Sequence, residues 1–166
     1  MRRPNQAGFT TSELLVAIGI IALVSLIAVP NVISMLPDYR LRSATQDLFS
    51  NFQKARIEAV KRNTDTAVCF SDNGYTIFVD NDGDFVADAG EAVVAEVNWN
   101  QYSDVGVTLA NVTFDNSSGQ PCIAFQPNGI PADHGGGVAA GRAPIDNIKG
   151  KIATVVVSQA GNISIN

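Results

Sequence analysis

One stretch of sixteen uncharged residues, Leu14–Val29, limits what this chain can fold into more than any other feature. It lies just after a basic start that contains Arg2 and Arg3. Extended by Phe9–Ser12 and by 31–36, the segment forms a helix that, at about 1.5 Å per residue, covers a hydrocarbon core of about 30 Å. We therefore expect a membrane-spanning helix, with the arginines cytoplasmic and the remainder exported.

The surroundings of this run are not those of an ordinary signal peptide. A secretory signal has a small-residue cleavage site after its apolar stretch, whereas Val29, Pro30 and Asn31 follow here and the small residue, Gly8, precedes the run. Glu13 lies at its edge, where a carboxylate is costly unless it is functional or paired. It is either a residue at headgroup level or an acceptor for a cation from a neighbouring chain.

The segment Gly8-Phe9-Thr-Thr-Ser-Glu13-Leu-Leu-Val-Ala-Ile resembles the class III leader of type IV prepilins and type II secretion pseudopilins. The resemblance implies that prepilin peptidase cuts after Gly8 and methylates Phe9, and that Glu13 pairs with the N-terminal amine of an adjacent subunit. Pro30 matches the family's helix proline, where loss of a backbone donor permits a kink. The residues between Phe9 and Glu13 are more polar than is usual in the family.

The pattern becomes amphipathic after Pro37. Apolar residues recur there at steps of three and four, which predicts a helix to about Arg62 whose apolar stripe lies on a sheet. A helix lying on the membrane surface is the alternative, although the stripe is thin and the charges are mixed. The stripe consists of Leu41, Ala44, Leu48, Phe52, Ala55 and Ala59.

The remainder is rich in short β-branched and aromatic runs separated by turn residues, which predicts antiparallel strands. An Asn73-Gly74 pair between two such runs indicates a hairpin. We expect the long stretch 126–149 to be a mobile loop. The predicted strands are 66–70, 75–79, 92–99, 105–109, 112–114, 122–125 and a last hairpin of 151–158 with 162–165.

A narrower resemblance covers most of the chain. The segment from Ala55 to Thr64 is similar to the GspH/FimT family of minor pilins and H-type pseudopilins, and the stretches around Val68-Cys69, Phe78–Glu91, Phe125–Gly129 and 156–161 fit it more loosely. This resemblance implies a structural subunit of a helical filament, at its tip or in assembly priming.

Cys69 and Cys122 both lie in apolar, strand-like runs. In an exported head the oxidising compartment favours a disulfide between them. The alternative is two buried free thiols that pack as small hydrophobic groups.

An acidic segment follows the predicted strand 75–79. Its acids stand at relative positions 1, 3, 5, 9 and 12, the side-chain ligand positions of an EF-hand-like calcium loop. Glycine stands at position 4, however, and Phe85 occupies the position that requires glycine. The segment is either a calcium-binding loop or an ordinary acidic hairpin connection, and its acids are Asp80, Asp82, Asp84, Asp88 and Glu91.

The charge balance argues against nucleic acid as a partner. Net charge is −5, and without Arg2 and Arg3 nine basic residues face sixteen acidic ones, which disfavours an extended binding face for DNA. Some FimT-like proteins bind DNA through a Gly-Arg-x-Arg pattern, but the matching stretch here is Gly161-Asn-Ile-Ser164. Arg142, Lys149 and Lys151 form a small basic cluster, interpreted as a solvated loop.

No catalytic set is recognisable, because His134 is the single histidine, and apart from calcium no cofactor is expected. The predicted fold is α+β: a leader (1–8), a membrane and assembly helix (9–36), its amphipathic continuation (37–62) and a periplasmic β-rich head (63–166). We expect a minor pilin of a type IV pilus, held in the inner membrane before assembly with other pilins. The alternatives are a type II secretion pseudopilin and, against the charge evidence, a DNA-uptake receptor.

Overall fold

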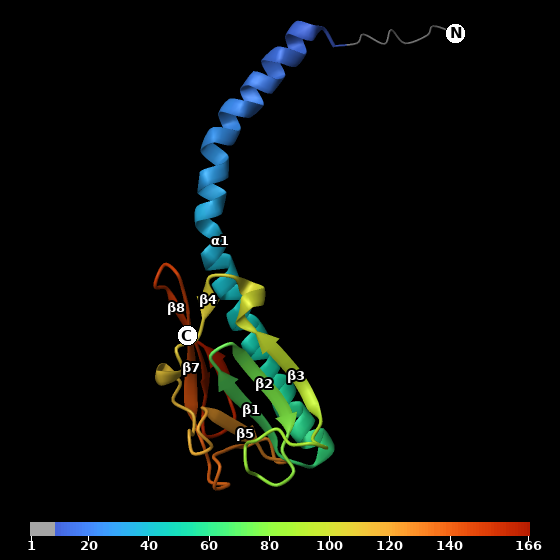
Figure 1. Cartoon of the computed structure of the whole chain (residues 1–166), viewed down its shortest axis with the longest axis vertical. Helices are drawn as coiled ribbons and strands as arrows, with labels where there is room; N and C mark the ends of the chain where they lie inside the picture. Colours follow the sequence, from blue (N-terminus) through green and yellow to red (C-terminus); the bar gives the residue numbers. More distant parts are fainter. Residues whose placement is uncertain (1–8) are drawn as a thin grey trace, which may run out of the picture. The chain divides into compact units, whose positions relative to one another are not determined.

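The computed structural model describes residues 9–166 and has the predicted α+β class (Figure 1). Its first element is one long helix, α1 (Thr11–Arg62), and the remaining elements are strands and short 3-10 turns. The chain divides into two units, one ending at Leu36 and one formed by Pro37–Asn166.

The second half of α1 belongs to the head and is amphipathic as predicted. All six residues of the predicted stripe, from Leu41 to Ala59, are buried. The helix ends at Arg62, where Asn63 takes a left-handed conformation (φ 54°) and the Thr64 N–H bonds to the Ala59 carbonyl at 3.3 Å. A residue in this conformation is the usual way to stop a helix and satisfy its last carbonyls.

The first antiparallel sheet has the strand order β3-β2-β1-β5-β6. The predicted hairpin between β1 and β2 is confirmed, with Asp72 and Asn73 as its turn residues and Gly74, the first residue of β2, paired with Ser71. The strands are β1 (Thr66–Ser71), β2 (Gly74–Val79), β3 (Val93–Asn98), β5 (Cys122–Phe125) and β6 (Pro131–Ala132).

The second antiparallel sheet has the order β4-β7-β8-β9. Its last hairpin was predicted from the sequence, and it turns through Gln159-Ala160-Gly161. The strands are β4 (Val105–Gly106), β7 (Gly141–Asn147), β8 (Ile152–Val157) and β9 (Ile163–Ile165), and the 3-10 turns are η1 (Trp99–Tyr102) and η2 (Leu109–Asn111).

Two expectations about the strands were wrong. The stretch 126–149 is not a loop, since it contains β6 and β7, and 112–114 is not a strand. β7 was missed because Gly141, Pro144 and Asp146 have low strand propensity. Asn147 and Lys151 form a hydrogen-bonded pair, and hydrogen-bonded and non-hydrogen-bonded pairs alternate along antiparallel strands. Pro144 and Thr154 are therefore a non-hydrogen-bonded pair, in which the Pro144 nitrogen points away from β8. For this reason the strand tolerates a proline that has no N–H to donate.

The main core lies between α1 and both sheets. Phe52 of α1 contacts three aromatic rings, Phe70, Phe114 and Phe125, with centroids 5.7–6.3 Å apart. A smaller core lies on the other face of the first sheet, because successive residues of β1 point to opposite faces. It contains Ala67, Cys69, Phe78, Phe85, Cys122 and Ala124.

Candidate assembly site

The start of α1 is closed by a reciprocal pair of side chains. The Thr10 N–H and hydroxyl both donate to Oε2 of Glu13, each at 2.9 Å, and the Glu13 N–H donates to the Thr10 hydroxyl at 3.3 Å. This is a capping box, which satisfies donors that a helix otherwise leaves unpaired. The Thr10-x-x-Glu13 spacing carries this signal in the sequence, although the capping box was not predicted.

Glu13 therefore has one oxygen engaged and one available. Both bonds from Thr10 go to Oε2, and within the described residues 9–166 no hydrogen bond to Oε1 is formed. The side chain is exposed, as is Phe9. A carboxylate in this state can accept an ammonium group from outside the chain while it continues to cap its own helix.

Gly8, the predicted cleavage residue, lies outside the described residues. The structure places Phe9 immediately before Thr10 in the non-helical start of the chain. Cleavage between Gly8 and Phe9 and methylation of Phe9 thus stay predictions. Cleavage there would leave Phe9 as the N-terminal residue, four positions from Glu13.

The first half of α1 exposes its apolar side chains all round. Within the described residues it is the one helix long and apolar enough to cross a membrane. Two of its hydroxyls are bonded internally, since Ser25 donates to the Ile21 carbonyl and Ser34 to the Asn31 carbonyl, both at 2.7 Å. Such internal bonds lower the cost of polar groups in lipid.

Pro30 lies inside α1, and the helix continues through it to Arg62. Because proline has no N–H, the Leu26 carbonyl one turn earlier lacks its helical partner. That missing bond locally weakens the helix. A kink or local melting at Pro30 stays a prediction.

Cys69 and Cys122 are joined by a disulfide in the structure. They are direct partners in the register of β1 and β5, and their Cα atoms are 4.2 Å apart. The bond links residues 53 positions apart in sequence and lies in the smaller core, beneath Phe85.

The acidic segment connects β2 to β3 and is organised by its own carboxylates. Asp80 is almost completely buried and accepts the N–H groups of Gly83 at 2.7 Å and Phe85 at 3.3 Å. Burial raises the pKa of Asp80 above its ordinary value, and these two N–H bonds oppose the rise. Glu91 accepts from the N–H groups of Asn81 and Asp88, which holds the ends of the loop together.

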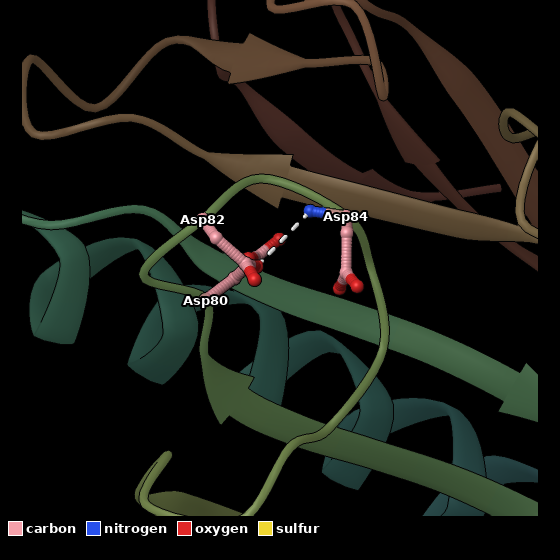
Figure 2. A group of neighbouring side chains, drawn as sticks. All are labelled: Asp80, Asp82 and Asp84. Carbon is pink, nitrogen blue, oxygen red and sulfur yellow. Dashed lines mark hydrogen bonds between the residues drawn. The ribbon is translucent and has the colours of Figure 1, made fainter.

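The structure brings together three of the five predicted calcium ligands (Figure 2). Carboxylate oxygens of Asp80, Asp82 and Asp84 lie within 4.8 Å of one another, whereas Asp88 and Glu91 do not join them. Phe85 has φ 61°, the left-handed conformation that an EF-hand loop gives to glycine at this position. The first half of the loop therefore groups three carboxylates, and no carboxylate from the second half joins them.

The turn between β8 and β9 lies on a basic side chain of α1. Arg56 donates to the Gly161 carbonyl at 3.0 Å. Gly161 has φ 77°, and a Cβ atom there would lie 2.5 Å from the Gly129 carbonyl oxygen. Asn162 and Ser164, which replace the two arginines of the DNA-binding pattern, follow directly.

The basic cluster expected from the sequence is only partly assembled. Lys149 and Lys151 both lie near Asp38 of α1, with Nζ to carboxylate distances of 3.9 and 2.5 Å. Arg142 lies near the opposite end of β7, facing Val156 of β8. A single three-residue patch for a phosphate backbone is therefore not formed.

Comparison with known proteins identifies the chain at the level of family. Residues 44–161 match the family model described as type II transport protein GspH, and residues 3–29 match the prokaryotic N-terminal methylation motif. No protein with a curated description matches the chain.

Two solved structures share the fold, both crystal forms of the type IV minor pilin FimU of Pseudomonas aeruginosa. The first has a TM-score of 0.58 at 20% identity and covers 78% of this chain and 90% of FimU. The second has a TM-score of 0.54 at 19% identity and covers 76% and 92%. The GspH match spans well over half of the chain, so the protein belongs to the GspH family of pilin-like proteins and carries the N-terminal methylation motif.

Proposed function

We propose that the protein is a minor pilin of a type IV pilus. In this proposal prepilin peptidase removes residues 1–8 and methylates Phe9, the apolar half of α1 holds the subunit in the inner membrane, and the head lies in the periplasm. Subunits then enter a helical filament, because head-to-tail contacts that do not close into a ring generate helical filaments. A position at the tip or in priming of assembly completes the proposal.

One observation carries this proposal: an apolar helix, exposed on all sides, begins with a carboxylate that keeps one oxygen available. The apolar surface of the helix can contact lipid before assembly and neighbouring helices once the subunit is in a filament. The free oxygen of Glu13 suits the Phe9 amine of an adjacent subunit, which sets the axial register. The match to the methylation motif supports the same chemistry at Phe9.

A pseudopilin of a type II secretion system is the second candidate, favoured by the description of the matching family. A deletion strain distinguishes the two. Loss of surface pili with normal export of secreted enzymes supports the pilin, and the reverse result supports the pseudopilin. Complementation with the wild-type chain is the control for both readouts.

Calcium binding at Asp80, Asp82 and Asp84 is a further proposal, supported by their grouping and by the turn at Phe85. Calcium takes six to eight oxygen ligands, so backbone carbonyls and water would supply the rest. Uptake of DNA has no comparable support, because neither Asn162 nor Ser164 can replace a cation at a phosphate.

A further inference from the structure

We propose that the disulfide in the smaller core is a site of thiol exchange that opens from one side, with Cys69 as the sulfur that is attacked and Cys122 as the sulfur that leaves. The partner that fits this site is a thiol–disulfide exchange protein that carries its reactive cysteine on a narrow, uncharged segment. The inference concerns the head alone and does not depend on the assignment to a pilus.

A hollow of about 240 Å³ lies beside the disulfide and opens onto one of its two cysteines. Cys69 lines this hollow and is 7% exposed, whereas Cys122 does not line it and is 0% exposed. Pockets for drug-sized ligands have volumes of roughly 300–1,000 Å³, so the hollow suits one side chain of a partner protein. Within residues 9–166, no charged side chain lines it. Its lining includes Cys69, Thr76, Phe78, Phe85, Val86 and Ser118.

The register of the sheet points the line of attack on Cys69 into this hollow. In thiol exchange the incoming sulfur approaches the attacked sulfur from the side opposite the leaving sulfur. Cys69 stands between Thr76 of β2 and Cys122 of β5, and direct partners in a sheet point to the same face. The direction from Cys122 through Cys69 therefore leads toward Thr76, which is half-buried and lines the hollow.

The approach to Cys122 is opposed by charge. Beyond Cys122 in the same row lies Asp115, which forms an isolated bridge with it. The Asp115 carboxylate is held in place, because it accepts the N–H groups of Ser117 at 3.0 Å and His134 at 2.9 Å. A fixed carboxylate repels an incoming thiolate, so the line of attack on Cys122 is unfavourable.

The surroundings of the two sulfurs also favour Cys122 as the leaving group. The Ser118 hydroxyl lies 3.7 Å from Cys122 Sγ and 3.4 Å from the Gln120 carbonyl, so its proton can turn to Cys122 once that sulfur carries charge. The Phe85 carbonyl oxygen lies 3.4 Å from Cys69 Sγ and 4.0 Å from Cys122 Sγ, which disfavours a thiolate more strongly at Cys69. A thiolate that is stabilised leaves faster.

The exchange conserves atoms and electrons. The partner's thiolate forms a bond with Sγ of Cys69 while the bond between Cys69 and Cys122 breaks. The electron pair of the broken bond stays on Cys122 as a thiolate, which then takes a proton from water. In the reverse direction the Cys122 thiolate attacks Cys69 in the mixed disulfide and releases the partner, which forms the bridge in the folded head.

Brief treatment of the oxidised, folded full chain in detergent with mercaptoethanol, a small neutral thiol, tests the inference. After a quench with excess maleimide, peptide mapping identifies which cysteine carries mercaptoethanol. We expect mercaptoethanol on Cys69 and maleimide on Cys122, in about tenfold or greater excess over the reverse pattern, and a loss of this preference in urea. Equal adducts, an excess on Cys122, or a disulfide that reacts only after unfolding would overturn the inference.

Four variants test the route and the leaving group. Ser118→Ala should slow opening of the disulfide about fivefold, whereas Ser118→Thr keeps the hydroxyl and should retain the wild-type rate. Thr76→Trp should fill the hollow and slow the reaction, while Thr154→Trp, at a half-buried threonine of the second sheet, should not. An unchanged rate in Ser118→Ala, or equal slowing by the two tryptophan variants, would contradict the assigned direction of opening.

Discussion

At the residue scale, the Glu13 carboxylate has one observed role and one proposed role. In the isolated chain it caps its own helix through Oε2, and in a filament it would bind the amine of a neighbour. The two roles are compatible because a carboxylate offers two oxygens and about four acceptor sites. Helix capping also fixes the orientation of the carboxylate before a neighbour arrives.

Glu13→Gln separates these roles. The amide oxygen can still cap Thr10, but the charge that attracts an ammonium is lost. A charge-assisted bond contributes about 1.5–3 kcal/mol, so we expect normal cleavage and at least a tenfold loss of the protein from sheared filaments. Thr10→Val is the matched control, because it removes the cap hydroxyl and keeps the charge. Filament levels of Glu13→Gln equal to wild type would contradict the role in assembly.

Gly161 is a position at which the addition of one carbon atom should destabilise the fold. Gly161→Ala places a side chain on a residue with a left-handed φ of 77°, and the new methyl carbon would lie 2.5 Å from the Gly129 carbonyl oxygen. We expect a loss of about 2–4 kcal/mol in the free energy of unfolding, measured by urea titration. Gly136→Ala is the control, since Gly136 has φ 75° with open space around it and should lose only about 1 kcal/mol. Equal losses would show that Arg56 and Gly129 do not constrain this turn.

At the element scale, the loop between β2 and β3 covers the disulfide. Phe85 closes the loop in a left-handed conformation that is strained for a bulky residue. Its side chain is buried against Cys69 and Cys122, and its N–H is held by Asp80. Burial of the ring thus offsets the backbone cost, and this is why the turn forms without the glycine that the sequence pattern seemed to require.

Calcium binding at this loop predicts a specific thermal response. Saturating calcium should raise the melting temperature relative to EDTA, by mass action on the folded state. Asp82→Ala should abolish that rise, while Asp133→Ala, in a separate acidic turn, should preserve it. An unchanged melting temperature of the wild-type protein in calcium would identify the loop as an acidic connection held by its own hydrogen bonds.

The disulfide predicts a stability difference between oxidised and reduced protein. Cross-linking residues 53 positions apart restricts the unfolded chain, and loops of this size contribute about 2–4 kcal/mol. Urea unfolding with and without a phosphine reductant should show this difference. The Cys69→Ala/Cys122→Ala double variant should match the reduced protein and ignore the reductant. A wild-type midpoint that reductant leaves unchanged would indicate that the bridge is not formed.

At the scale of the whole molecule, the sequence predicted what depends on periodicity and local turn chemistry. The six-residue stripe of α1, its end at Arg62 and the two hairpins at Asn73-Gly74 and 159–161 are confirmed. β7 could not be predicted, because its strand character comes from pairing with β8 rather than from its own residues. The contacts of Asp38 with a turn more than a hundred residues later have no local signal at all.

The candidate site shows the same division. Phe9 and Glu13 were predicted from a contiguous leader pattern and stay predictions, whereas the separate environments of Oε1 and Oε2 of Glu13 are visible only in the structure. The grouping of Asp80, Asp82 and Asp84 followed from sequence spacing, but the separate use of Glu91 did not. Side-chain partners that are distant in sequence depend on packing, which a single sequence does not specify.

The intact mass of the protein purified from its native membranes shows whether the chain has passed through the prepilin pathway. We expect a chain that begins at Phe9, carries one added methyl group on its amine, and is lighter by two hydrogens because Cys69 and Cys122 are bridged. Reduction should restore the two hydrogens and leave the methyl group. A chain that retains residues 1–8 in cells with active prepilin peptidase would contradict the assignment to the pilin pathway.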